Sequence, residues 1–255
     1  MLHRSPRLSG LSRSRWWLDG LAQAVDWLKD RTQSCIWQML NRFGLRYKRG
    51  REYIHSPDPD YDLKLSYIRA AERLARSQPE HYILLYQDEV TYYRRPSLAR
   101  AYARKCSKMP LAYQGRTTNK RRRIAGALDA IRGTVIAQQR SSFNRRRLIA
   151  YYREIEATYP NAKTVFLVQD NWPVHFHPDI LDALTDSRTC LLRLPTYAPW
   201  TNPIEKLWLR LKQELLHQHD FKDDWESLQQ AVQDWLDHCD DDPQDLLHYV
   251  GLFPY

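Results

Sequence analysis

The chain has 255 residues, of which 43% are hydrophobic, and it carries nine Trp, sixteen Tyr and a formal net charge of +9. This length accommodates one catalytic domain of about 150 to 200 residues and a small additional segment. No stretch approaches the roughly 20 consecutive apolar residues of a membrane span, and the basic N-terminus lacks the apolar core of a secretory signal. We therefore expect a cytoplasmic protein without a membrane segment. Four widely separated cysteines without CxxC spacing indicate buried, reduced thiols: Cys35, Cys106, Cys190 and Cys239.

Residues 1–52 are predicted to form a small helical DNA-binding segment. Apolar residues recur at helical spacing over 16–29, and a second helix is predicted over 34–43. Only a short turn separates the two, which is compatible with part of a helix-turn-helix module whose second helix enters a major groove. A simple helical hairpin is an equal alternative.

Residues 53–78 are predicted to form a linker and a connecting helix, with the helix over 63–77. A polar run with two prolines leads into this helix, as is typical of a linker, and a basic stretch precedes it. A basic arm of this kind can lie in a minor groove, although a flexible tether between domains has the same composition. The candidate DNA contacts in the arm are Lys48, Arg49 and Arg51.

Residues 79–255 are predicted to form a catalytic domain of the α/β class, in which a mixed sheet is flanked by helices. The apolar strand over 163–170 is expected to be buried on both faces, as a central parallel strand is. The other predicted strands cover 81–88, 121–130, 133–142 and 190–194, with a hairpin turn at Arg132-Gly133. The predicted helices cover 144–159, 178–186 and 203–217, with a last amphipathic helix within 222–242.

The positive charge is concentrated in one segment of this domain. Residues 94–123 hold eleven Arg or Lys and no acid, whereas residues 220–245 hold ten acids and one basic residue, Lys222. A basic segment of this kind favours a surface that binds nucleic acid, with a solvated basic loop as the alternative. The expected DNA contacts within it are Lys120, Arg121, Arg122 and Arg123.

Three acidic residues stand where a metal-dependent nuclease needs them. Asp88 and Asp170 each end a predicted strand, and Glu205 lies in the first turn of the helix after PTYAPWTNP. Carboxylates gathered at the edge of a sheet can share hard divalent cations. Each acid alone has a structural alternative: a strand-end acid for the two aspartates and, for Glu205, a capping box with Asn202 as N-cap. The three together favour a metal site.

Five motifs accompany these acids in a fixed order along the chain. They are YKRGREYIHSPDPDY at 47–61, QDE at 87–89, GAL at 126–128, QDNWPVH at 169–175 and LPTYAPWTNPIEKLW at 194–208. In addition, 81 residues separate the first acid from the second and 34 separate the second from the third. With these features the chain resembles a DDE transposase of the mariner superfamily, in the bacterial insertion-sequence branch.

The resemblance implies a ribonuclease-H-like fold that cuts and joins DNA in a bacterial, nucleoid-associated enzyme. The implied partners are double-stranded DNA with terminal inverted repeats, a TA target and further copies of the chain. The implied cofactor is Mg²⁺ or Mn²⁺, with two ions held by Asp88, Asp170 and Glu205, one activating water or a 3′-hydroxyl and the other stabilising the leaving oxygen. Asn171 and His175 match family positions and are expected to orient ligands or substrate, with a helix cap or a loop hydrogen bond as the alternative. Glu89 and His177 are expected to be bystanders.

The alternative to an active enzyme is a catalytically silent or decayed transposase remnant that binds DNA without cutting it. Retention of all three acids favours the enzyme, since a silent remnant has no need of them. A general nuclease of the same fold is a third possibility, which the basic N-terminal segment disfavours. One departure from the family is that about 50 residues precede the linker, enough for roughly one of the two helix-turn-helix units expected. The other unit is then expected from a separate upstream reading frame, or the gene is a decayed copy.

Overall fold

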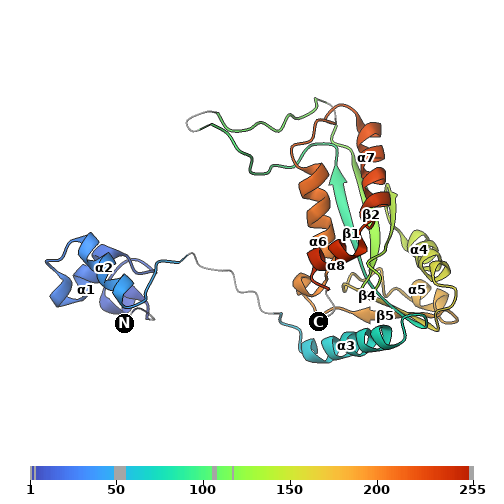
Figure 1. Ribbon diagram of the computed structural model, residues 1–255, viewed down its shortest axis with the longest axis horizontal. Helices are drawn as coiled ribbons and strands as arrows, with labels where there is room; N and C mark the ends of the chain where they lie inside the picture. Colours follow the sequence, from blue (N-terminus) through green and yellow to red (C-terminus); the bar gives the residue numbers. More distant parts are fainter. Residues whose placement is uncertain (1, 3, 49–55, 105–107, 117, 253–255) are drawn as a thin grey trace. The chain divides into compact units, whose positions relative to one another are not determined.

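The computed structural model describes residues 2, 4–48, 56–104, 108–116 and 118–252. The chain divides into two compact units, Met1–Ile54 and His55–Tyr255. Figure 1 shows both units. The predicted DNA contacts Arg49 and Arg51 lie outside the described residues, whereas Lys48 is described and exposed. No helix in the described ranges has the length and apolarity needed to cross a bilayer.

The N-terminal unit contains two short α-helices around a very small core. Its elements are the 3₁₀ turns η1 (Pro6–Ser9) and η2 (Asp26–Leu28) and the helices α1 (Leu18–Ala24) and α2 (Gln33–Arg42). The prediction of one continuous helix over 16–29 is wrong because the backbone becomes extended at Val25, with φ −128° and ψ 107°. The break allows Leu28 to join Leu21 and Ile36 in the buried core, and this burial offsets the helical hydrogen bonds that are lost.

A five-stranded mixed sheet forms the centre of the larger unit. The strands are β1 (Tyr82–Tyr93), β2 (Arg121–Asp129), β3 (Val135–Arg140), β4 (Thr164–Gln169) and β5 (Thr189–Arg193), in the spatial order β3-β2-β1-β4-β5. β1 pairs antiparallel with β2 and parallel with β4, which confirms the predicted mixed sheet of the α/β class. β2 pairs antiparallel with β3, which confirms the predicted hairpin. The hairpin turn is closed by Gly133 at φ +73° and by the Asp129 carboxylate, which accepts the backbone N–H of Ile131 and of Arg132.

Helices cover both faces of this sheet, because alternate strand residues point to opposite sides. One core includes Leu84 and Tyr86 of β1, and the other includes Ile83 and Leu85. In Figure 1, α6 and α4 lie on opposite sides of the β1–β2 pair. The first core is covered by α3 (Tyr61–Ser77), α6 (Ile204–Leu211), α7 (Trp225–His238) and α8 (Pro243–Val250), and the second by α4 (Arg145–Thr158) and α5 (Pro178–Ala183).

Two predicted boundaries are wrong. β1 does not end at Asp88 but continues to Tyr93, because β2 pairs with it along that whole length. The helix predicted over 203–217 changes after Leu211 into a π-helical turn, Lys212–Leu216. The amphipathic helix predicted within 222–242 is confirmed as α7, but it is not the last helix, because α8 follows, capped by the Asp242 side chain and opened by proline. The prediction that the cysteines are buried is also wrong for Cys35 and Cys190, which are exposed.

The polar run before α3 is anchored at its C-terminal end. Ser56 Oγ donates to the carbonyl oxygen of Thr196 at 2.6 Å, and Thr196 N–H donates to Asp58 Oδ2 at 2.7 Å. Lys64 of α3 forms a salt bridge of 2.6 Å with the same carboxylate oxygen. Lys64 and the Thr196 N–H hold the pKa of Asp58 well below its usual range. This segment therefore fixes the loop between β5 and α6.

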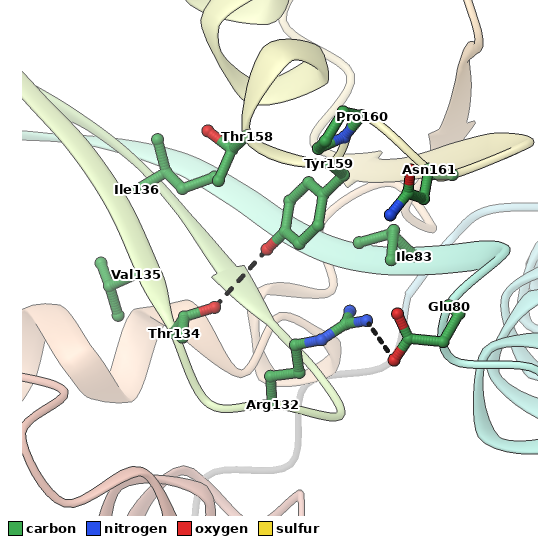
Figure 2. A pocket seen from close by; sticks show the side chains of 11 residues that line it. Glu80, Ile83, Arg132, Thr134, Val135, Ile136, Thr158, Tyr159, Pro160 and Asn161 are labelled. Carbon is green, nitrogen blue, oxygen red and sulfur yellow. Dashed lines mark hydrogen bonds and ion pairs between the residues drawn. The ribbon is translucent and has the colours of Figure 1, made fainter.

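The N-terminal end of β1 borders a cavity of about 390 Å³ that lies away from the three acids (Figure 2). Arg132 and Glu80 both line the cavity, with Arg132 Nη2 3.6 Å from Glu80 Oε1. Thr134 Oγ1 lies 3.5 Å from the Tyr159 hydroxyl. Arg132 also pairs with Asp129, which is buried and accepts a hydrogen bond from Tyr159 at 3.0 Å. These bonds tie the hairpin turn to the end of α4.

Candidate active site

Strand register brings two of the three predicted acids level with each other. In the parallel β1–β4 pair the last register partners are Tyr86 and Val168. Two residues further along each strand lie Asp88 and Asp170. Because neighbouring strands are about 4.8 Å apart, the two aspartates flank the point where β4 ends and β1 continues.

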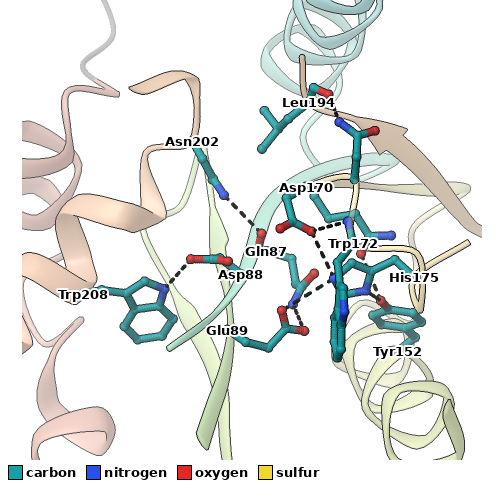
Figure 3. A network of polar contacts seen from close by, with 12 residues as sticks. Gln87, Asp88, Glu89, Tyr152, Asp170, Trp172, His175, Leu194, Asn202 and Trp208 are labelled. Atoms are coloured by element: carbon teal, nitrogen blue, oxygen red, sulfur yellow. Dashed lines mark hydrogen bonds and ion pairs between the residues drawn. The ribbon is translucent and has the colours of Figure 1, made fainter. Parts of the chain in front are cut away.

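Asp88 lies half-buried on the α6 side of β1. The Trp208 indole Nε1–H of α6 donates to Asp88 Oδ2 at 3.1 Å (Figure 3). Gly126, the cross-strand partner of Asp88 on β2, makes room for that indole, since a Cβ there would lie 2.5 Å from Trp208 Cη2. Burial raises the pKa of the Asp88 carboxyl to about 8, and the negative charge of Glu205 adds to this shift.

Glu205 is exposed in the first turn of α6, near enough for its charge to act on Asp88. The capping-box alternative for Glu205 is wrong. Pro203 occupies the cap position, and α6 has no side-chain cap. Asn202 is buried, and its Nδ2 instead donates to the carbonyl oxygen of Gln87 at 3.3 Å. Asn202 therefore ties the start of α6 to β1, leaving Glu205 without a capping role.

Asp170 is the more exposed of the two aspartates, with 55% of its side chain accessible. Its Oδ1 accepts the backbone N–H of Trp172 at 2.9 Å, which closes a turn directly after β4. The same oxygen lies 3.5 Å from His175 Nε2. Both contacts hold this carboxylate from the side away from Asp88, as Figure 3 shows.

His175 is buried at 1% exposure and joins three elements. Its Nδ1 lies 2.7 Å from the Tyr152 hydroxyl of α4, and its Nε2 lies 3.5 Å from Glu89 Oε2 of β1. Gln87 Nε2 in turn donates to Glu89 Oε1 at 2.9 Å. Glu89, expected to be a bystander, is thus part of the buried polar network behind Asp170 (Figure 3).

Asn171 and His177 have structural contacts in the same region. Asn171 Nδ2 donates to the carbonyl oxygen of Leu194 at 2.7 Å, which is the loop hydrogen bond anticipated as an alternative. His177 is the N-cap of α5, and its Nδ1 accepts the backbone N–H of Asp179 at 3.2 Å. Asn171 therefore connects the end of β4 with the loop that leads to α6.

The acids form a concentrated negative region. In the described part of the chain, no salt bridge joins Asp88, Glu89, Asp170 or Glu205 to a lysine or arginine, and the ion pairs of these acids involve only His175. Within the same residues, no three His, Cys, Asp or Glu side chains stand close enough together to hold a metal ion. The three predicted ligands are therefore neighbours rather than a formed ligand set. Their donors are carboxylate oxygens, which suit Mg²⁺ and Mn²⁺.

The predicted DNA-binding residues of the larger unit lie further along the β1–β2 ribbon than Asp88. Lys120 precedes β2, and Arg121 to Arg123 form its first three residues, so they lie at the end of the β1–β2 ribbon beyond Asp88. Arg122 faces the opposite side of the sheet from its two neighbours, because side chains alternate along a strand. Lys48 lies in the other unit.

Two residues with clear contacts at the site were not predicted. Trp208 and Gly126 lie within two of the five motifs, but neither has a titratable side chain that would mark it as functional. Their connection depends on packing between α6 and β2, which sequence periodicity does not reveal. For Trp208 the available signal was a tryptophan three residues after Glu205, on one face of a helix.

Comparisons with known proteins agree with this geometry. A family model described as DDE superfamily endonuclease matches residues 83–228. The chain is 25% identical over 234 residues to the insertion element IS630 uncharacterized 39 kDa protein of Shigella sonnei, covering 91% of this chain and 67% of that protein.

Two solved structures show the same fold. The Mos1 transposase paired-end complex with left transposon end matches with a TM-score of 0.64 and 18% identity, covering 90% of this chain and 69% of that chain. The catalytic domain of Mos1 mariner transposase matches with a TM-score of 0.53 and 15% identity, covering 80% of this chain and 91% of that chain. The predicted ribonuclease-H-like fold is confirmed. Because the family model spans more than half of the chain and contains Asp88, Asp170 and Glu205, this protein belongs to the DDE superfamily of endonucleases.

Proposed function

We propose that this protein is a transposase that cuts DNA strands and joins their 3′ ends to a target, using divalent metal ions. The observation that carries the proposal is the placement of Asp88, Asp170 and Glu205 near one another, from two adjacent strands and one helix. Burial raises the pKa of Asp88, and the negative charges of Glu205 and Asp170 add to the shift. An acidic region of this kind is costly unless a cation neutralises it.

The side chains are suited to such a cation in two ways. All three donors are hard oxygens, and the two that must approach Asp88 are on accessible side chains, Asp170 and Glu205. When bound, two divalent ions supply activation of water or a 3′-hydroxyl and stabilisation of the leaving oxygen. Trp208 orients the Asp88 carboxylate, and the Trp172 N–H and His175 orient that of Asp170. The protein itself then needs no nucleophilic side chain.

The partners proposed for the chain follow from the similar structures and from the family resemblance. Those structures include a Mos1 paired-end complex with a transposon end, a strand transfer complex and complexes with Mn or Mg. For this chain we propose terminal inverted repeats and a TA target as DNA substrates, two Mg²⁺ or Mn²⁺ ions, and assembly of more than one copy on the DNA. The cytoplasm, in association with the nucleoid, is the corresponding location.

The test is strand cleavage by purified protein with Mg²⁺ or Mn²⁺ and labelled DNA carrying the element's ends. We expect Asp88→Asn, Asp170→Asn and Glu205→Gln each to abolish cleavage, because each change removes a ligand oxygen while preserving shape. DNA affinity, measured with Ca²⁺ in place of Mg²⁺, is expected to stay within about twofold, since no phosphate-binding cation is lost. Asp186→Asn, an exposed acid outside the site, is the matched control and should cut normally.

Two outcomes would contradict the proposal. If any of the three variants keeps near-normal cleavage, its residue is not a ligand and the site is wrongly assigned. If the wild-type protein binds the ends but does not cut them with either metal, the chain is a silent DNA-binding remnant. Calorimetric titration with Mn²⁺ gives an independent reading, because each of the three variants should bind the ion more weakly than the Asp186 control.

A further inference from the structure

Three arginines on two neighbouring strands share one face of the sheet beyond the catalytic acids. Ala125 and Ala127 of β2 are buried against the α4 layer, so Arg123 and Arg121, two and four residues before Ala125, continue the same face. Arg140, the last residue of β3, is the cross-strand partner of Arg123. Arg121 and Arg140 are exposed, and Arg123 is half-buried.

This arrangement is unfavourable for the protein by itself. Like charges directly opposite each other on adjacent strands destabilise a sheet, and Arg123 and Arg140 are such a pair. None of the salt bridges formed among the described residues involves either of them or Arg121. Two acids of this layer are engaged elsewhere: Glu154 of α4 accepts a hydrogen bond from Gln138, and Glu89 of β1 contacts Gln87 and His175. Three guanidinium groups are therefore available to an external anion.

Residues of β1 add a hydroxyl and an aromatic ring to this face. Thr91 is the cross-strand partner of Arg123, and Tyr93 is the partner of Arg121. Tyr93 is exposed, with 46% of its surface accessible. Guanidinium groups bind phosphate through paired hydrogen bonds, and exposed aromatic rings stack on nucleic-acid bases. We name Arg121, Arg123, Arg140, Thr91 and Tyr93 the arginine face.

The arginine face is continuous with the acidic region along β1. Thr91 follows Glu89 by two residues on the same side of the strand, and Glu89 contacts His175 beside Asp170. Arg123 lies three residues from Gly126, the partner of Asp88, or about 10 Å at the usual rise of about 3.3 Å per residue. Asp88 itself points to the opposite, α6 face of β1, so a polyanion lying on the arginine face reaches the acidic region from the side of Glu89 and Asp170.

We propose that the arginine face binds the phosphates of the DNA strand next to the phosphodiester that is cut. This inference rests on the proposed function and adds a binding surface to it. It also divides the basic run at 120–123: Arg122 points to the other face, where its partner Tyr92 packs against Trp225 of α7, so Arg122 does not contact the same strand.

The test compares two triple variants with the same change in charge. Arg121→Gln, Arg123→Gln and Arg140→Gln together remove the arginine face. Arg69→Gln, Arg73→Gln and Arg153→Gln together remove three exposed arginines on α3 and α4 and serve as the control. DNA affinity is measured with Ca²⁺ over a range of salt concentrations. Each lost phosphate contact lowers the slope of log K against log salt by about 0.9, so we expect a decrease of about 2.7 for the arginine-face variant.

The control variant and Arg122→Gln should leave this slope nearly unchanged. An unchanged slope in the arginine-face variant, or an equal loss in the control, would overturn the inference. Thermal unfolding without DNA checks that the variant folds: removing the opposed charges of Arg123 and Arg140 should leave the melting temperature equal or higher. A melting temperature several degrees lower would show a structural role for these arginines and would also overturn the inference.

This result is separable from the proposed function. Metal-dependent cutting by the wild-type protein tests the enzyme, whereas the salt slope is measured without cutting. An active wild type with an unchanged slope in the arginine-face variant would refute only the arginine face. A wild type that never cuts, with a reduced slope in that variant, would refute the catalytic proposal and the placement beside a cut phosphodiester, while leaving the arginine face as a phosphate-binding surface.

Discussion

At the residue scale, Asp88 depends on two neighbours that have no acid–base chemistry of their own. Trp208 Nε1 donates to the carboxylate at 3.1 Å, and the absence of a side chain at Gly126 leaves space for the indole. Trp208 is 1% exposed, so the donor is held in one orientation by packing. A ligand oxygen fixed in this way loses less freedom when it binds a cation.

We expect Trp208→Phe to slow cleavage by about 10- to 100-fold, because hydrogen bonds to charged groups contribute about 1.5 to 3 kcal/mol. DNA affinity with Ca²⁺ should change little. Single-turnover cleavage rates and filter binding measure the two effects. The control is Trp235→Phe, whose Nε1 donates to Glu214 at 2.7 Å away from the site. Equal slowing in both variants would mean that the Trp208 hydrogen bond has no special role.

Gly126→Ala tests the space for the indole. The added Cβ would lie 2.5 Å from Trp208 Cη2, and overpacking of a core typically costs about 1 to 3 kcal/mol. We expect the free energy of unfolding to fall by that amount in urea denaturation. Adding Trp208→Phe should restore most of the stability but not the cleavage rate, since the smaller ring removes both the clash and the donor. Failure of the double variant to regain stability would place the strain elsewhere.

At the scale of elements, the loop between β5 and α6 is fastened at three points around the acids. Asp58 accepts the Thr196 N–H, Asn171 donates to the Leu194 carbonyl oxygen, and Asn202 donates to the Gln87 carbonyl oxygen. This loop delivers Glu205 to the site. Its position therefore depends on a segment more than a hundred residues earlier in the chain, which precedes α3.

Asp58 should make this fastening sensitive to acid. Its pKa is lowered in the folded protein by Lys64 and the Thr196 N–H, relative to an unfolded value of about 3.9. Its contribution to stability is fully present above that unfolded value and is lost as the pH falls through the lower folded pKa. We expect Asp58→Asn to destabilise the protein at pH 7 and to differ less from wild type at pH 3.

Urea unfolding at the two pH values measures this difference, with Asp186→Asn as the control for loss of an exposed acid. Because the loop carries Glu205, Asp58→Asn should also slow cleavage at pH 7. A difference from wild type that is the same at both pH values would show that the ionised form of Asp58 is not what fastens the loop.

At the scale of the whole molecule, the two units differ greatly in the size of their cores. Among its described residues, the N-terminal unit buries three large apolar side chains, Leu21, Leu28 and Ile36, whereas the larger unit has two extensive cores on either side of its sheet. Small cores give marginal stability. We expect two separate unfolding transitions, with the N-terminal unit unfolding at the lower urea concentration.

Core substitutions can assign the two transitions. Ile36→Ala should shift only the first transition and Leu167→Ala only the second, since truncating a buried Leu or Ile costs about 2 to 5 kcal/mol. Hydrogen exchange followed by mass spectrometry identifies which unit unfolds in each transition. A single transition that both variants shift equally would show that the units unfold cooperatively.

The sequence by itself determined the kind of elements, their order and the three acids. Alternation and apolar runs identified the strands, because burial of one or both faces imposes a period that local composition retains. Helix ends were harder to predict: the break at Val25 follows from how neighbouring segments pack, which no local signal records. The strand that carries Asp88 was expected to stop there, since its pairing with β2 is a non-local contact.

Only the tertiary structure decided how these residues act together. Strand register set Asp88 level with Asp170, and the α6–β2 contact paired Trp208 with Gly126. Glu89 became part of the site through a buried histidine from another element. Arg140 joined Arg121 and Arg123 because β3 pairs with β2 in one register. Such relations depend on contacts between residues far apart in the chain, whereas sequence patterns report mainly the environment of each residue in its own element.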